Sequence, residues 1–134
     1  MMKYMTEHDY QELRKIAIAE PHDLSYLWDW VQDPNVGYVN QNLLFTFKER
    51  REAFFEVLER LMVDKVLFLE KDGIFLQGSI KQQIDLFRKS FPNSEEEILS
   101  IGGMFVWFVL PSCPAYAVWK QIKKNGEFEY YWSQ

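Results

Sequence analysis

The sequence has a single cysteine, Cys113, among 134 residues, and it contains only six glycines and five prolines. One cysteine excludes an internal disulfide framework and a four-ligand zinc site. With so little glycine and proline, no linker-like stretch divides the chain. The length itself is typical of one domain, so we expect a single domain over residues 1–134.

Long apolar runs are also missing. The longest, residues 104–110, is far shorter than the roughly 20 residues that a membrane helix requires. The first residues, MMKYMTE, contain no apolar segment of the kind found in secretory signals. We therefore expect a cytoplasmic protein with a reduced thiol and no membrane contact.

Basic residues are fewer than acidic residues. Fifteen Lys and Arg residues stand against twenty Asp and Glu residues, which gives a net charge of −5. Proteins that bind nucleic acid normally carry a basic surface, so the charge argues against a nucleic-acid partner. It favours a basic protein partner, which an acidic surface attracts over long range. Residues 1–46 hold seven acids and three bases, so most of the excess lies there.

Patterns for catalysis or metal binding are scarce as well. His8 and His22 are the only histidines, and no ligand or triad spacing links them. Cys113 has no recognisable base partner that would activate it as a nucleophile. No glycine-rich phosphate motif occurs, and the acidic run 95–97 follows a cap residue, where the helix dipole favours carboxylates. The sequence predicts no enzyme, no cofactor, no metal and no small-molecule ligand.

What the sequence does contain is helix-capping residues and aromatic residues, which make up 17% of the chain. Thr6 and Asp23 each precede an apolar stripe at helical spacing. Thr46, Ser79 and Ser94 each stand three residues before a Glu or Gln, which is the capping-box pattern of three further helices. The stripe after the second cap consists of Leu24, Leu27, Trp28 and Val31.

Two short strands are expected in the middle of the chain. Residues 66–69 and 74–76 are apolar and flank the pair Asp72-Gly73, which is typical of a tight hairpin turn. Further on, residues 104–110 fit a strand that is buried on both faces.

The C-terminal part predicts a hairpin. Residues 115–122 and 127–132 flank the dipeptide Asn125-Gly126, the strongest short hairpin signal. A two-residue turn there would place Trp119 opposite Trp132, on a face that covers the core. The order of elements predicts an α+β fold: N-terminal helices, a short β-hairpin, two further helices and a C-terminal antiparallel β-meander.

A family resemblance begins in the middle of the chain. The segments that carry it are 47–50, 71–79, 83–88 and 91–97, followed by Trp107-Phe108, Cys113-Pro114 and Val118-Trp119. Together they resemble the small bacterial domain-of-unknown-function family five-nine-six. The chain departs from that family at Ala115-Tyr116, where small glycines would be expected. The family offers no catalytic residues to carry over.

The resemblance implies a functional context. Members of the family occur in contact-dependent inhibition and polymorphic-toxin loci, where small cytosolic proteins act as immunity partners. We therefore expect a toxin-binding immunity protein that neutralises a basic toxin domain by direct binding. The alternative is a winged-helix-like nucleic-acid-binding regulator, because a helix, a hairpin and a second helix with Lys81, Arg88 and Lys89 follow one another.

The predicted partner-binding surface lies in the acidic N-terminal part, outside the resemblance. It consists of Asp23, Asp29, Trp30 and Asp33. Asp29 and Asp33 are one helical turn apart, where like charges repel. Trp30 lies off the apolar stripe of its helix, and an exposed Trp among acids is a suitable anchor for a basic partner.

Overall fold

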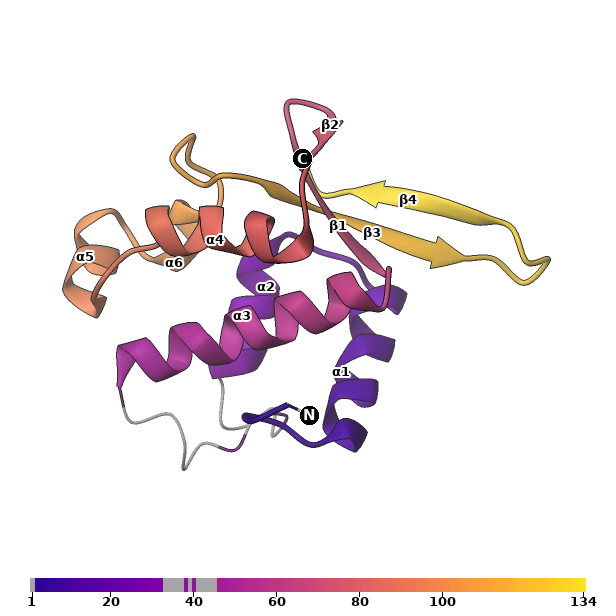
Figure 1. Ribbon diagram of the computed structural model, residues 1–134, viewed down its shortest axis with the longest axis horizontal. Coiled ribbons are helices and arrows are strands. Elements are labelled where there is room, and N and C mark those ends of the chain that lie inside the picture. Colours follow the sequence, from indigo (N-terminus) through magenta and orange to yellow (C-terminus); the bar gives the residue numbers. More distant parts are fainter. Residues whose placement is uncertain (1, 33–37, 39, 41–45) are drawn as a thin grey trace.

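The computed structural model describes residues 2–32, 38, 40 and 46–134. The described chain is an α+β fold in which one antiparallel sheet lies over a layer of helices (Figure 1). The helices are α1 (Glu7–Ala19), α2 (Leu24–Gln32), α3 (Phe47–Val63), α4 (Ile80–Ser90), α5 (Glu95–Ser100) and α6 (Met104–Trp107). The strands are β1 (Leu67–Lys71), β2 (Ile74–Phe75), β3 (Tyr116–Ile122) and β4 (Phe128–Trp132), in the order β2-β1-β3-β4.

The predicted helix starts are confirmed by the cap hydrogen bonds. The hydroxyl groups of Thr6, Thr46 and Ser94 each accept from the backbone N–H three residues on, at 3.1–3.2 Å. Ser79 and Gln82 form a complete capping box, in which each side chain accepts from the other residue's backbone N–H. These bonds satisfy backbone donors that the first turn of a helix leaves unpaired.

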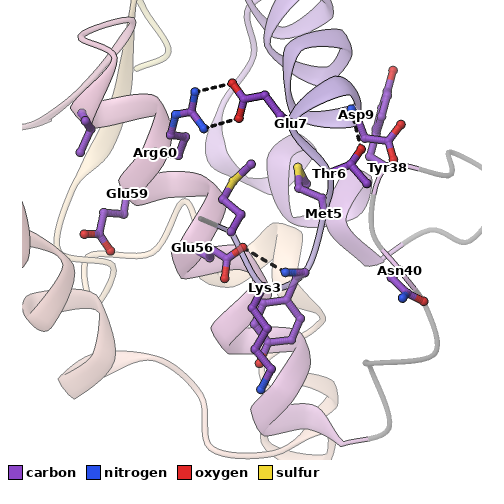
Figure 2. Close-up of a pocket in the computed structure, with 13 residues that line it drawn as sticks. Lys3, Met5, Thr6, Glu7, Asp9, Tyr38, Asn40, Glu56, Glu59 and Arg60 are labelled. Atoms are coloured by element: carbon purple, nitrogen blue, oxygen red, sulfur yellow. Dashed lines mark hydrogen bonds and ion pairs between the residues drawn. The ribbon is translucent and has the colours of Figure 1, made fainter.

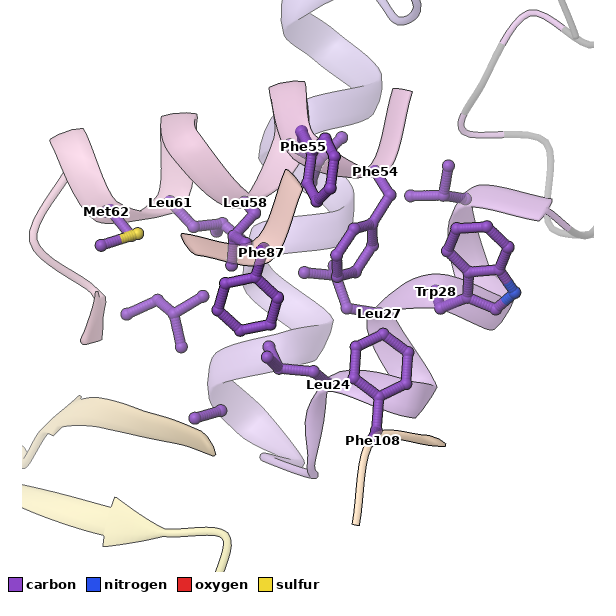
Figure 3. Close-up of a cluster of buried hydrophobic side chains, with 14 of the residues drawn as sticks. Leu24, Leu27, Trp28, Phe54, Phe55, Leu58, Leu61, Met62, Phe87 and Phe108 are labelled. Carbon is purple, nitrogen blue, oxygen red and sulfur yellow. The ribbon is translucent and has the colours of Figure 1, made fainter. Parts of the chain in front are cut away.

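The main core is built where α2, α3 and α4 converge (Figure 3). The whole predicted stripe of α2 is buried. Phe54 of α3 lies at the centre, with ring centroids 5.6 Å from those of Trp28 and Phe108 and 6.0 Å from that of Phe91. Aromatic rings at these separations and tilts attract one another in addition to the area that they bury.

Residues 104–110 form a short helix and turns, so the prediction of a buried strand there is wrong. Gly102 and Gly103 have φ angles of 101° and 107°, which end α5, and the Gly103 N–H donates to the carbonyl oxygen of Ile98 at 2.9 Å. Met104 and Trp107 are buried, whereas Phe105 between them is 62% exposed. An uninterrupted apolar run is compatible with either structure, and only the contacts decide.

The C-terminal hairpin forms, but the predicted register is wrong by one residue. The Gly126 N–H donates to the Lys123 oxygen and the Lys123 N–H donates to the Glu127 oxygen, which closes a three-residue loop over 124–126. Gly126 has a φ angle of 87°, as expected for a turn followed by a bulge. Trp119 therefore pairs with Tyr131, and Trp132 pairs with Val118. Because side chains alternate along a strand, this shift moves Trp132 to the face opposite Trp119.

The helix-facing side of the sheet is tied to the N-terminal part of the chain. Trp119 is 1% exposed, and its indole N–H donates to the backbone oxygen of His22 at 2.7 Å. The Gln121 amide donates to the oxygen of Ile18 at 2.9 Å. Helix α1 lies against β3, and α3 lies against β1. The other side of the sheet points away from these helices (Figure 1).

Candidate functional site

The outward side of the sheet carries a cluster of aromatic rings, which we name the aromatic sheet face. Its members are Phe68 of β1, Phe75 of β2, and Phe128, Tyr130 and Trp132 of β4. Phe75 stacks on Trp132 at 5.2 Å and lies 5.6 Å from Tyr130, measured between ring centroids. The cluster therefore spans three of the four strands as one continuous surface.

The aromatic sheet face is open. Every residue of β4 is exposed, and Trp132 has 41% of its surface accessible. Ile122, which pairs with Phe128, adds an exposed aliphatic side chain on the same face. Single exposed apolar residues are common, but a contiguous patch of large apolar side chains marks an interaction site in a folded monomer.

A recess of about 230 Å³ lies at one edge of this face. We name it the Glu70 recess; it is lined by Glu70, Asp72, Gly73, Tyr116, Trp132 and Gln134. Glu70 points to the outward side, because it pairs with Phe75 on one strand and with Tyr116 on the other. Only 3% of its surface is exposed, and its carboxylate accepts from the Gly73 N–H at 2.9 Å. Trp132 belongs to both the recess and the aromatic sheet face.

The structure describes three of the four residues of the sequence-predicted surface. Asp23 caps α2 and accepts from the backbone N–H of Ser25 at 2.8 Å and from its hydroxyl. Asp29 is exposed, and Trp30 is half-buried and packed against the core. Asp33 lies outside the described residues. The cap role of Asp23 and the packing of Trp30 give both residues a structural function beside any binding role.

A second, larger pocket of about 900 Å³ lies between the N-terminal segment and α3 (Figure 2). Two of its charged groups form an ion pair, in which the Glu7 carboxylate accepts two bonds of 2.7 Å from Arg60, and the Glu56 carboxylate accepts from the backbone N–H of Tyr4 at 3.1 Å. The Arg60 guanidinium holds the pKa of Glu7 at about 2. Asp64, at the C-terminal end of α3, accepts from the Tyr10 hydroxyl at 2.5 Å and from Arg14 at 3.2 Å, and these bonds tie α1 to α3.

The residues considered for chemistry lie apart. Cys113 is buried, and burial raises the pKa of its thiol to about 11. Such a thiol is protonated at neutral pH and is a weak nucleophile. His22 stacks on Tyr26 with centroids 3.8 Å apart, and His8 is exposed on α1. Among the described residues there is no group of three or more His, Cys, Asp or Glu side chains placed to hold a metal ion.

The basic residues behind the alternative hypothesis are partly engaged. Arg88 binds the Glu52 carboxylate at 2.6 Å and lies 4.8 Å from the ring centroid of Phe55. Lys81 and Lys89 are exposed on α4.

The described helices are all too short or too polar to span a lipid bilayer.

The fold and the site together define a class: an antiparallel sheet with helices on one side and an open aromatic surface on the other. The chain belongs to the family described as "Protein of unknown function, DUF596", which matches residues 62–133. This confirms the resemblance that the sequence predicted. The matched region includes all four strands, and hence both the aromatic sheet face and the Glu70 recess.

The chain is similar to a protein of known structure. It is an uncharacterised protein, conserved in bacteria, from Neisseria meningitidis. The two chains are 26% identical with a TM-score of 0.70, and the match covers 94% of this chain and 88% of the neighbour. No curated protein matches the chain.

Proposed function

We propose that this chain is an immunity protein that neutralises a toxin domain by binding it directly. The observation that supports the proposal best is the open aromatic sheet face. Tyr and Trp are among the residues that most often dominate binding energy at protein interfaces, and Tyr130 and Trp132 lie exposed on a strand that pairs with β3. A rigid, preformed aromatic surface binds a protein partner with little loss of conformational entropy.

The charge of the chain supports a basic partner. With a net charge of −5, the chain attracts a cationic protein over long range and accelerates the encounter. The aromatic sheet face then slows dissociation, because buried aromatic anchors control the lifetime of a complex more than its formation. A protein held in this way blocks the active site or substrate groove of the toxin without chemistry of its own.

The acidic surface of α2 is the second candidate docking surface for the same function. Asp29 is exposed there and Trp30 presents part of its ring. If the partner docks there, Asp29→Lys combined with Asp33→Lys slows association and flattens its salt dependence, whereas Trp30→Ala speeds dissociation. Stopped-flow binding at several salt concentrations separates this surface from the aromatic sheet face.

The experiment is a growth-protection assay. The domain encoded by the adjacent upstream gene is expressed in cells with and without this chain, and both growth and co-purification of the two proteins are measured. We expect growth arrest without the chain, protection with it, and a stable complex. Arrest that persists despite equal expression of the two proteins, or protection without a complex, would overturn the proposal.

A matched pair of variants links protection to the surface. Trp132→Ala removes a ring from the aromatic sheet face, and Phe105→Ala removes an exposed ring from α6. We expect the first variant to weaken the complex and the second to leave it unchanged. Equal effects of the two would show that the aromatic sheet face is not the docking surface.

A further inference from the structure

The Glu70 carboxylate is buried without a countercharge. With 3% of its surface exposed, Glu70 receives a single hydrogen bond, from the Gly73 N–H, and no ion pair within the described part of the chain includes it. Acidic residues are almost never buried this deeply unless they are paired, since removing a charge from water is costly. The described part of the chain therefore offers this carboxylate no oppositely charged partner.

The nearest basic residue along the chain, Lys71, is held elsewhere. Its ammonium donates to the Cys113 oxygen at 2.8 Å and to the Pro111 oxygen and the Tyr116 hydroxyl at 3.3 Å. It lies 4.6 Å from the centroid of the Tyr116 ring. These bonds hold Lys71 at the loop that precedes β3, and it forms no ion pair with Glu70.

We propose that the Glu70 recess receives a lysine or arginine side chain of the protein partner. The recess combines a buried carboxylate with the exposed carboxylate of Asp72 and with the ring of Trp132, whereas the Tyr116 ring that also lines it already holds the Lys71 ammonium. Cations bind both to carboxylates and to the faces of aromatic rings, most strongly to Trp. This proposal rests on the proposed function, because it assumes a protein partner that is basic.

The dimensions and the surroundings of the recess favour a side chain over a free ligand. Its volume of about 230 Å³ is below the roughly 300–1,000 Å³ of small-molecule pockets. Trp132 connects the recess to the aromatic sheet face, so a partner seated on that face reaches the recess with one projecting side chain. The described residues place no third carboxylate, histidine or cysteine beside Glu70 that would complete a metal site.

The first test does not need the toxin. N-acetyl-lysine methylamide is titrated into the protein while the indole N–H resonance of Trp132 is followed by NMR, with N-acetyl-norleucine methylamide as the uncharged control. We expect a saturable shift with the lysine compound only, and its loss in Glu70→Gln. An equal shift with both compounds, or an unchanged shift in Glu70→Gln, would overturn the proposal.

Glu70→Gln also separates a binding role from a structural one. Its amide oxygen can still accept the bond from Gly73, so we expect thermal stability to be equal to or above that of the parent. A large drop in stability would assign Glu70 to the turn and overturn the proposal. The second variant is Asp72→Asn, at an exposed position whose φ angle of 55° Asn tolerates. We expect it to reduce, but not abolish, the NMR shift caused by the lysine compound.

The final test uses the toxin domain of the growth assay. We expect Glu70→Gln to weaken that complex by roughly tenfold or more, mainly through faster dissociation. If the lysine compound binds but no toxin complex forms, the proposed function is wrong and the recess is a cation site for another protein. If the complex forms and Glu70→Gln leaves it unchanged, the recess proposal is wrong and the function stands.

Discussion

The two faces of β3 use aromatic residues in different ways. On the helix-facing side, Trp119 is 1% exposed and its indole N–H bonds to the backbone of His22. On the outward side, Trp132 of the neighbouring strand is 41% exposed, although it stacks on Phe75. The same residue type is a closed core element on one side and an accessible surface element on the other.

This difference shows how a small sheet can be stable while one side stays open. Val118 lies on the outward side, paired with Phe68 and Trp132, yet it is fully buried. The rings of the aromatic sheet face therefore shelter the centre of the sheet while their edges remain accessible. Rings that already pack on one another would lose little side-chain freedom if a partner bound to them.

The strongest way to sharpen the contrast is Trp119→Ala. We expect this variant to lose about 3–5 kcal/mol of unfolding free energy, because a large buried ring is removed and a cavity is left. It also leaves the His22 oxygen without its donor. Urea denaturation followed by circular dichroism measures the loss. An unchanged midpoint would contradict the burial described for this face.

Trp132→Ala probes the open face with the same substitution. We expect a smaller loss of unfolding free energy than for Trp119→Ala, and a loss of about 2 kcal/mol or more in the free energy of binding to the proposed toxin partner. Calorimetry of the complex together with urea denaturation of the free protein gives both values. If Trp132→Ala destabilises the fold as much as Trp119→Ala does, the two faces do not differ in the way described.

Gly126→Ala tests the register that separates the two tryptophans. The φ angle of 87° at this position disfavours any residue with a Cβ, so we expect a loss of about 1 kcal/mol. The added methyl group itself meets no neighbouring atom within 4 Å, which isolates the backbone effect. Thermal unfolding checks the value, and a stabilised variant would contradict the three-residue loop.

The smallest expected effect concerns the ion pair between Glu7 and Arg60, which joins α1 to α3. Arg60 lowers the pKa of Glu7 from 4.5 to about 2. A lowered folded-state pKa contributes stability that is present above pH 4.5 and is lost as the pH falls towards 2. We expect Glu7→Gln to flatten the pH dependence of stability in that window only. If the difference in unfolding free energy between Glu7→Gln and the parent stays constant from pH 4.5 to pH 2, the lowered pKa of Glu7 is contradicted.

The parts of the fold that depend on local chemistry could be read from the sequence. Caps such as Ser79 act within four residues, so the starts of the helices followed from neighbouring side chains. The α2 stripe and the family resemblance were likewise confirmed. Residues 104–110 were misassigned because a short, uninterrupted apolar run has no periodicity that distinguishes a buried strand from a buried helix.

The aromatic sheet face could not be found in the same way. Asn125-Gly126 fits both a two-residue and a three-residue loop, and the choice depends on hydrogen bonds at Lys123 that the sequence does not reveal. A one-residue difference then moved Trp132 from the expected core side to the open side. The recess was missed for a related reason: Glu70 and Trp132 are far apart in the chain and meet only through β3. The alternation of Phe128, Tyr130 and Trp132 was the available signal.

The lone thiol has a practical consequence. Cys113 is buried beside the start of β3, its Sγ donates to the Ala115 oxygen, and its pKa of about 11 leaves little thiolate at neutral pH. A thiol reagent can therefore modify the folded chain only after this segment opens. The rate of labelling, measured against denaturant, reports how often the junction between the helical layer and the sheet opens. Because the sequence contains one cysteine, the labelling rate reports the opening of this segment alone.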